Sequence, residues 1–413
     1  MIERKSDKLV FCCVFMISAL LIFLRRPDIV LSPIPWAEDG RIWLAQAHNI
    51  GVSSIFMVQD GYMQTISRIA YIIGNAFGLE YAPLVANIIA ISLRCSMCAF
   101  FMTRRFSYIG IEVRLVLAAY FLLMPNISEG YVNITNAQWY LSLYAIGVLV
   151  SDKATSATWK AHDIFILLVS GLSGPFVLFL LPCLIFKYFI PCIKNRCLEG
   201  AINYETYIVI LCFAIQILAL SSGFNKRSNA PLGASIELLA TIFSMRIFTG
   251  SIFDVRYMEF VTSHVTINLI IFTIYSLLVV TLIIRGDWRV RSIAFFAILM
   301  ISSSLIKPMM SLHSEQWPAF LSPGSGERYF SIINFIFICS ISLSIKLLVK
   351  ANDRAISLSL IFIIIPVLYS FNIEKVSNIE WKQEIKKYNY SKPGDAVQFS
   401  TAPSGWEMEI IKK

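Results

Sequence analysis

Long apolar runs separated by short polar segments make up most of the chain. In a bilayer every backbone N–H and C=O must be paired within its own segment, so apolar runs of about 17–25 residues predict spanning helices. The runs are 9–24, 81–102, 112–124, 137–150, 163–173, 175–190, 206–221, 265–284, 292–306, 330–349 and 356–372. The pattern predicts an all-α polytopic membrane protein with about eleven transmembrane helices, and with amphipathic helices in its outer loops.

One pair of runs leaves the helix count open. Ser173, Gly174 and Pro175 separate them, and proline removes a backbone donor while glycine loosens the chain. The two runs therefore form either two helices that meet at an outer turn or one broken helix. The count lies between ten and twelve.

Composition supports a membrane protein and excludes several other classes. Of 413 residues, 57% are hydrophobic and 15% are charged, against about 45–50% and about 25% in soluble proteins. The formal net charge is +9, but the basic residues stand in small groups between apolar runs. This distribution favours membrane lipid as a partner over nucleic acid.

Lysine and arginine in the loops predict the orientation. With the N-terminus inside, the short inner segments are denser in Lys and Arg than the outer loops, as the positive-inside rule requires. Residues 1–372 are then expected to form the transmembrane domain with periplasmic loops, and residues 373–413 a short periplasmic tail. The N-terminus would be cytoplasmic, and the first helix would stay uncleaved because no A-x-A signal follows it.

The most distinctive polar segment follows the first helix. Residues 35–40 read PWAEDG, with Glu38 and Asp39 adjacent. Mutual repulsion between two such carboxylates raises the pKa of one of them, which suits a general base. Asp39 is slightly favoured because its shorter side chain beside Gly40 is held more rigidly. In the alternative interpretation, Asp39 is only the N-cap of an amphipathic helix over 41–50.

Other outer segments supply candidate binding groups. Arg328 follows the flexible Gly324-Ser325-Gly326, and with Arg68 and Lys307 it is a candidate clamp for a phosphate. An Arg at a helix entry, or a Trp at the bilayer edge, is also explained by interfacial anchoring. Asn136 is expected to cap the helix that begins at 137. The candidate sugar-binding residues are Trp36, Tyr62, Glu129, Asn133, Gln138, Trp139, Tyr329 and Trp406.

Several motifs are missing from the sequence. It contains no Walker loop, no G-x-G-x-x-G after a strand, no H-E-x-x-H and no D-x-D. These absences disfavour ATP or a nucleotide sugar as a substrate. We expect no metal and no cofactor.

Six blocks together carry a family resemblance: PWAEDG, GYMQTISR, EGYVNITNAQWYL, GLSGPF, GERYF and APSGW, spread from residue 35 to 408. Their order resembles the serotype-converting O-antigen glucosyltransferases, the Gtr group of C-type polytopic glycosyltransferases. The resemblance implies a bacterial inner-membrane enzyme that transfers glucose from polyprenyl-phosphate glucose to lipid-linked O-antigen on the periplasmic face. It also implies a functional link to a flippase and a polyprenyl-phosphate glucosyltransferase, and an acidic base in the first outer loop, here Glu38 or Asp39.

The chemistry fits this resemblance. Polyprenyl phosphate is already a good leaving group, so one base suffices where a glycosidase needs two carboxylates. Three other classes remain as alternatives. An O-antigen polymerase would want a large periplasmic loop with paired arginines, a lipid-linked sugar flippase would carry charges along a central cavity, and a membrane acetyltransferase would usually need an intramembrane histidine.

Overall fold

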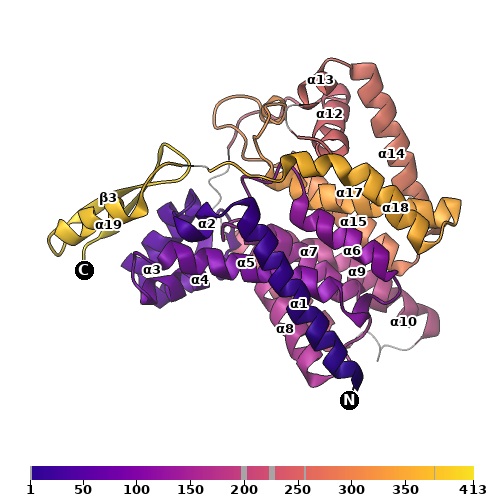
Figure 1. Ribbon diagram of the computed structural model, residues 1–413, viewed down its shortest axis with the longest axis horizontal. Coiled ribbons are helices and arrows are strands. Elements are labelled where there is room, and N and C mark those ends of the chain that lie inside the picture. The colour runs from indigo at the N-terminus through magenta and orange to yellow at the C-terminus, as the bar shows by residue number, and fades with distance from the viewer. Residues whose placement is uncertain (1, 197–201, 223–227, 255–256, 376) are drawn as a thin grey trace.

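The computed structural model describes residues 2–196, 202–222, 228–254, 257–375 and 377–413, and it is built mainly of helices (Figure 1). Eight helical segments in this part of the chain are long and apolar enough to cross a membrane. They are Asp7–Arg25, Ala82–Phe101, Pro175–Lys194, Tyr204–Ser221, Val265–Arg285, Trp288–Ile306, Arg328–Val349 and Asp353–Ser370. The prediction of an all-α polytopic membrane protein is confirmed.

The other three predicted runs are helices as well, but they are shorter. They are α6 (Ile111–Leu123), α7 (Ala137–Val150) and α8 (Ala157–Gly171), of 13, 14 and 15 residues. Nearly every residue of α7 is buried, because a helix that is apolar on all sides belongs inside the bundle. The helix α8 ends before Gly174, whose φ is +141°, and η4 (Pro175–Leu180) begins after it. The uncertain pair is therefore two helices joined by a turn.

The remaining elements complete the chain in order. Before α6 they are α1 (Ile2–Arg25), α2 (Asp28–Leu31), η1 (Asp39–Leu44), α3 (Ala45–Asn49), η2 (Gly51–Phe56), β1 (Val58–Gln59), β2 (Tyr62–Met63), α4 (Thr65–Ala76), α5 (Ala82–Phe101) and η3 (Arg104–Phe106). From α9 to η6 they are α9 (Leu181–Leu184), η5 (Ile185–Phe189), α10 (Ile190–Asn195), α11 (Tyr204–Ser221), α12 (Ile236–Ile242) and η6 (Phe243–Thr249). The last group is α13 (Glu259–Thr262), α14 (Val265–Arg285), α15 (Trp288–Ile306), α16 (Gln316–Ala319), α17 (Arg328–Ser344), η8 (Ile345–Val349), α18 (Asp353–Ile364), η9 (Ile365–Ser370), α19 (Trp381–Tyr390), β3 (Ala396–Thr401) and β4 (Trp406–Ile411).

The bundle has two loop ends, which we name after residues in them. At the Asp39 end, the loops 26–81, 124–136, 307–327 and 371–380 meet, and Asp39 bonds to Thr135 there. At the Arg289 end, the loops 102–110, 151–156, 286–287 and 350–352 meet, and Arg289 bonds to Asp152. Charged and polar contacts thus lie at the ends, with the apolar helices between them.

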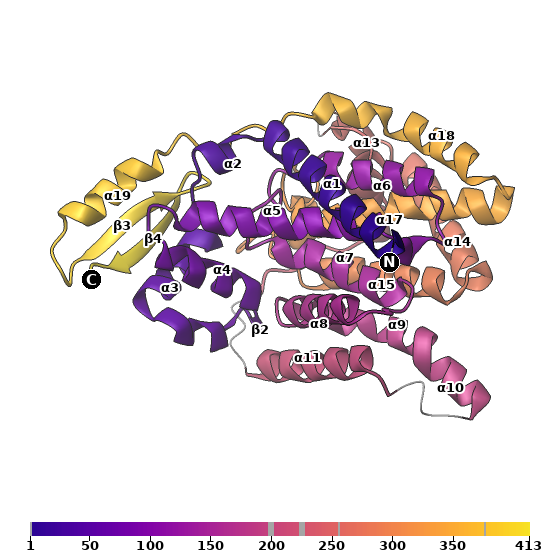
Figure 2. The ribbon, with the colours of Figure 1, turned by 60° about the horizontal axis from the view of Figure 1, so that its bottom comes forward.

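The chain's last segment forms a small unit of α19 and the antiparallel hairpin β3–β4. It projects from the bundle beside α3 and α4 (Figures 1 and 2). Strand residues alternate between buried and exposed, so Val397, Phe399, Met408 and Ile410 face inward. Trp381 of α19 donates its indole N–H to the carbonyl of Leu79 at 3.1 Å. The hairpin and α19 therefore cover the segment that contains residues 35–80.

A buried arginine joins three helix ends at the Asp39 end. Arg25, the last residue of α1, is 2% exposed. Its guanidinium donates to the carbonyls of Leu122 at 2.6 Å and Met124 at 3.2 Å, at the end of α6. It also donates to the carbonyls of Ser370 at 3.0 Å and Phe371 at 2.8 Å, after η9. The last carbonyls of a helix have no partner within it, and Arg25 supplies one for two helices.

Replacing Arg25 should therefore destabilise the whole bundle. Because each buried carbonyl left without a partner costs about 1–3 kcal/mol, Arg25→Met should lower the free energy of unfolding by about 2–5 kcal/mol. Thermal unfolding of the purified protein measures the loss. The neighbouring Arg26 contacts Asp28 at 3.4 Å, so Arg26→Met is the matched control and should cost clearly less. Equal losses in the two variants would contradict the role given to Arg25.

Candidate functional site

The acidic turn is shaped by the C-terminal hairpin. The N–H of Ala37 donates to the carbonyl of Ala402, and the N–H of Ala402 donates to the carbonyl of Pro35 at 3.0 Å. A Cβ on Gly40 would lie 2.7 Å from Cγ2 of Thr401, so only glycine lets the hairpin approach this closely. Residues far apart in the sequence thus fix the backbone that carries Glu38 and Asp39.

Asp39 lies at the start of η1 and is 1% exposed. Its Oδ1 accepts hydrogen bonds from the backbone N–H of Thr135 at 2.9 Å and from its hydroxyl at 2.6 Å. Burial raises the pKa of the Asp39 carboxyl to about 7, and the Thr135 hydrogen bonds oppose that shift. The structure shows no side-chain cap on η1, so the capping interpretation of Asp39 is wrong. The Asp39 carboxylate instead accepts hydrogen bonds from Thr135 in the 124–136 loop.

Behind this contact lies a second buried group. The indole N–H of Trp43 donates to Oγ1 of Thr135 at 2.6 Å, and the Arg68 guanidinium lies 4.9 Å from the Trp43 ring. Arg68 is 1% exposed and donates to Gln46, and burial lowers its pKa to about 10. Its Nε and Nη2 have no hydrogen-bond partner among the described residues. Arg68 therefore sits inside the protein, supporting the wall of the site.

Arg328 opens α17 and forms an ion pair. Its Nη1 donates to Oε1 of Glu129, and its backbone N–H donates to Oε2 of Glu129 at 3.2 Å. Glu38 forms no direct ion pair with Arg328 in the part of the chain that the structure describes, but it lies near enough for its charge to act on Arg328. We name Glu38, Glu129 and Arg328 the acid–arginine cluster. Glu38 is half-buried, and the Arg328 and Glu129 side chains are 25% and 17% exposed. This cluster is partly exposed to solvent, whereas Asp39 is buried.

Glu327 locks the start of α17 onto the 124–136 loop. Its Oε2 accepts from the hydroxyl of Ser128 at 2.8 Å and from the backbone N–H of Glu129 at 3.1 Å. Burial raises the pKa of the Glu327 carboxyl. The position of Arg328 is therefore fixed by the contacts of Glu327 with the 124–136 loop and by its own contacts with Glu129.

Sequence reasoning missed Arg246, which shapes the loop before α17. Its guanidinium donates to the carbonyls of Phe320 at 2.7 Å, Ser322 at 2.9 Å and Ser325, and burial lowers its pKa. The signal was a single charge inside the apolar stretch 238–249, a pattern that marks a functional or paired group. Arg246 organises the flexible Gly-Ser-Gly segment that precedes Arg328.

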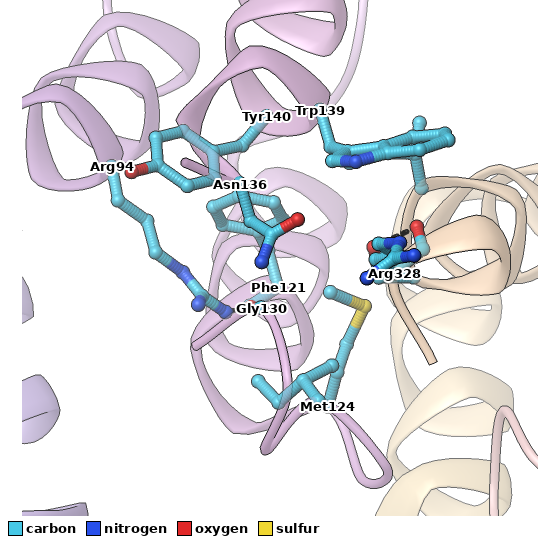
Figure 3. Close-up of a pocket in the computed structure, with 11 residues that line it drawn as sticks. Arg94, Phe121, Met124, Gly130, Asn136, Trp139, Tyr140 and Arg328 are labelled. Carbon is cyan, nitrogen blue, oxygen red and sulfur yellow. Dashed lines mark hydrogen bonds between the residues drawn. The ribbon is translucent and has the colours of Figure 1, made fainter. Parts of the chain in front are cut away.

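A small cavity of about 20 Å³ lies beside the acid–arginine cluster. Trp139 lies over Arg328, and Asn136 lies between Arg328 and Arg94 in the view of Figure 3. Arg94 donates to the carbonyls of Tyr131 at 2.5 Å and Phe121 at 2.9 Å. The indole N–H of Trp139 is buried without a hydrogen-bond partner among the described residues. A donor at this position can receive a ligand oxygen.

The other predicted residues lie at several places around this end. Tyr329 packs edge-to-face on Trp139 at 5.6 Å. Trp36 is half-buried and bridges to Ala402, and Trp406 lies 5.8 Å from the Arg41 guanidinium. Both tryptophans therefore flank the acidic turn.

Three further residues have mainly structural contacts. Asn136 stands at the N-cap position of α7, but its side chain does not make the predicted capping hydrogen bond, and Oδ1 of Asn133 accepts from the backbone N–H of Asn136 at 3.0 Å. That prediction was wrong because the Asn136 amide donates to the carbonyl of Glu129 instead. Gln138 lies in the first turn of α7 against Gly174.

Two predicted residues lie at the margins of this region. Tyr62 is carried on the β1–β2 hairpin, which Gln216 holds through the N–H of Met63 at 3.0 Å. Lys307 is exposed at the end of α15, two residues before Met309, whose N–H donates to the Tyr329 hydroxyl at 3.0 Å. The part of the chain that the structure describes contains no group of three or more His, Cys, Asp or Glu residues placed to hold a metal ion.

Comparisons with known proteins give a likeness at the level of structure alone. No family model matches the sequence, and no curated protein matches it. A similar solved structure is the oligosaccharyltransferase of Archaeoglobus fulgidus, crystallised with zinc and sulfate, at 10% identity and a TM-score of 0.45. The alignment covers 92% of this chain and 55% of that one, so the chain spans about half the length of that protein. The activity has to be argued from the residues of the site.

The buried Asp39 makes a specific pH prediction. With a folded-state pKa near 7 against an ordinary value of 3.8, the native protein holds this proton more tightly than the unfolded chain. Its contribution to stability is full below about pH 4 and is lost as the pH rises to about 7. Asn has no proton to lose, so Asp39→Asn should remove this part of the pH dependence. Unfolding temperatures from pH 4 to 8 measure it, with the exposed Glu374→Gln as control. Parallel wild-type and Asp39→Asn curves would contradict the shift.

Proposed function

We propose that this chain transfers glucose from polyprenyl-phosphate glucose to a sugar of lipid-linked O-antigen, on the periplasmic face of a bacterial inner membrane. The transfer inverts the anomeric carbon and uses no metal. The observation that carries the proposal is the acid–arginine cluster of Glu38, Glu129 and Arg328. It places a carboxylate and a guanidinium together, partly open to solvent, at the first residue of a spanning helix.

The position of Arg328 suits a lipid phosphate. The donor's tail stays in the bilayer, so its phosphate is confined to the bilayer edge, where α17 begins. Helix N-termini attract anions through their unpaired N–H groups and dipole, and a guanidinium binds phosphate through two parallel hydrogen bonds. Glu129 holds the Arg328 guanidinium in place. The donor phosphate would bind this guanidinium together with Glu129 or in place of it.

Burial favours Glu38 as the base. A general base has to touch the acceptor hydroxyl. Glu38 is half-buried and near enough for its charge to act on Arg328, while Asp39 is buried against Thr135. We therefore assign proton removal to Glu38, in place of the slight sequence-based preference for Asp39. Asp39 becomes a positioning residue, which holds the acidic turn against the 124–136 loop.

The reaction then balances without further groups. Glu38 takes the proton of an acceptor hydroxyl, whose oxygen attacks the anomeric carbon of glucose from the face opposite the phosphate. The bond between that carbon and the phosphate oxygen breaks, and a new glycosidic bond forms. Arg328 offsets the charge that develops on the leaving phosphate. Glu38 later returns its proton to water.

Aromatic side chains provide surfaces for the acceptor. Trp36 and Trp406 flank the acidic turn, and Trp139 and Tyr329 flank Arg328. Flat apolar rings with a polar edge suit sugar faces. A polyprenyl-phosphate glucosyltransferase would make the donor on the cytoplasmic face, and a flippase would carry it across.

The direct test is structural analysis of O-antigen from bacteria with and without this chain. Wild type should add one hexose per repeat, and Glu38→Gln should lower the transfer rate by about 10²–10⁴, the usual loss when a general base is removed. Glu374→Gln, an exposed acid outside the site, is the matched control at equal membrane protein level. Longer O-antigen without added hexose would instead indicate a polymerase. Unchanged glucosylation by Glu38→Gln with loss in Asp39→Asn would return the base to Asp39.

Glucose transfer should depend on the planar guanidinium of Arg328. Arg328→Lys keeps the charge but loses the bidentate geometry, so transfer from polyprenyl-phosphate glucose should fall about tenfold or more. The assay follows glucose transfer by purified protein with increasing donor, and the KM for the donor should rise. Arg354→Lys at the Arg289 end is the control and should keep wild-type kinetics. A wild-type donor KM in Arg328→Lys would make Arg328 a simple interface anchor.

A further inference from the structure

A large apolar cavity lies toward the Arg289 end of the bundle, away from the acidic turn. Its volume is about 460 Å³. It follows the same helices as the small cavity, about one turn further along each: Cys98 after Arg94 on α5, Tyr144 after Tyr140 on α7, and Ile336 after Ile332 on α17. Phe121 lines both cavities. Nothing in the proposed transfer reaction uses the large cavity.

The lining of this cavity suits hydrocarbon. Most of it consists of aliphatic and aromatic side chains of α5, α6, α7, α15 and α17. Water in a buried site needs two to four polar partners each, and this lining offers few. The chain crosses a membrane several times, so the hydrocarbon available at this depth is that of lipid chains.

The rim of the cavity carries charge. Arg285, Asp287, Arg289, Lys346 and Asp353 all line it at the Arg289 end. Arg289 is committed to Asp152 at 2.7 Å and to the carbonyl of Val150 at 2.8 Å. Asp287 caps α15 by accepting from the N–H of Val290 at 3.0 Å. These two charges therefore have structural partners.

The other two basic residues of the rim are available to a ligand. Arg285 is exposed, and no carboxylate of the described residues lies within 4.0 Å of it. Lys346 meets Asp353 only at 3.7 Å, and the two side chains are 46% and 38% exposed. A pair as exposed as this contributes little. An apolar cavity with two available cations at its mouth is complementary to an amphiphile that has an anionic headgroup.

We propose that this cavity binds one anionic phospholipid of the leaflet at the Arg289 end. An acyl chain fills the cavity, and the headgroup phosphate lies between Arg285 and Lys346. Arginine and lysine bind phosphate by charge-assisted hydrogen bonds, and juxtamembrane basic residues attract anionic lipids in general. The site is independent of glucose transfer and would be present even with another activity at the Asp39 end.

The test uses purified full-length protein, delipidated and then titrated with defined lipids under native mass spectrometry. Phosphatidylglycerol should give a single retained adduct, while phosphatidylcholine and inorganic phosphate should not. The double variant Arg285→Gln/Lys346→Gln should lower the apparent affinity for phosphatidylglycerol at least tenfold. The matched double variant Lys350→Gln/Arg354→Gln removes two exposed charges near the same end but outside the rim, and should stay within twofold of wild type.

A second variant tests the cavity itself. A Cβ on Gly147 would meet only Phe106 Cζ at 3.9 Å, so Gly147→Leu fills space without a backbone clash and should abolish the adduct. Equal binding of phosphatidylcholine, or an adduct that survives both Gly147→Leu and the rim double variant, would overturn the proposal. Preferential retention of a polyprenyl phosphate over phosphatidylglycerol would overturn it too, by assigning the cavity to the carrier lipid.

Discussion

The structure depends on pairing the carbonyls that helices leave open inside a membrane protein. A helix ends with carbonyls that have no partner, and lipid offers none. Here buried arginines supply the donors: Arg25 joins the ends of α1, α6 and η9, Arg94 joins the end of α6 to the loop that follows it, and Arg246 gathers the loop before α17. Each arginine binds several carbonyls from separate segments. The irregular backbone of the site is possible because these side chains complete its hydrogen bonding.

The acidic turn is built on that framework. Arg94 and Arg25 fix the 120–131 region by its carbonyls, and Thr135 in the same loop holds Asp39. The hairpin β3–β4 presses on the other side at Gly40. Residues from three distant parts of the chain thus hold the backbone of the acidic turn. This explains why a short carboxylate pair can be held at the bilayer edge without a helix cap.

Sequence patterns located the helices well, because apolar length and backbone pairing decide where a chain crosses a bilayer. All eleven predicted runs are helical. The patterns could not separate Glu38 from Asp39, since the difference arises from Thr135, nearly a hundred residues away. They predicted a phosphate-binding role for Arg68 and for Arg328 alike, but Arg68 is buried against the Trp43 ring. Arg246 escaped notice because its partners are backbone carbonyls, which no side-chain motif records.

The same four helices, α5, α6, α7 and α17, line two cavities of different size. Near the Asp39 end, Arg94, Asn136 and Arg328 line a space of about 20 Å³, and further along a cavity of about 460 Å³ is lined mostly by apolar side chains. Phe121 divides the two, and the carbonyl of this residue is bound by Arg94. Charged groups lie toward the two loop ends, since a charge deeper in the bundle would lose hydration without gaining a partner. Under the two proposals above, the interior would hold hydrocarbon and the Asp39 end would hold phosphate and sugar.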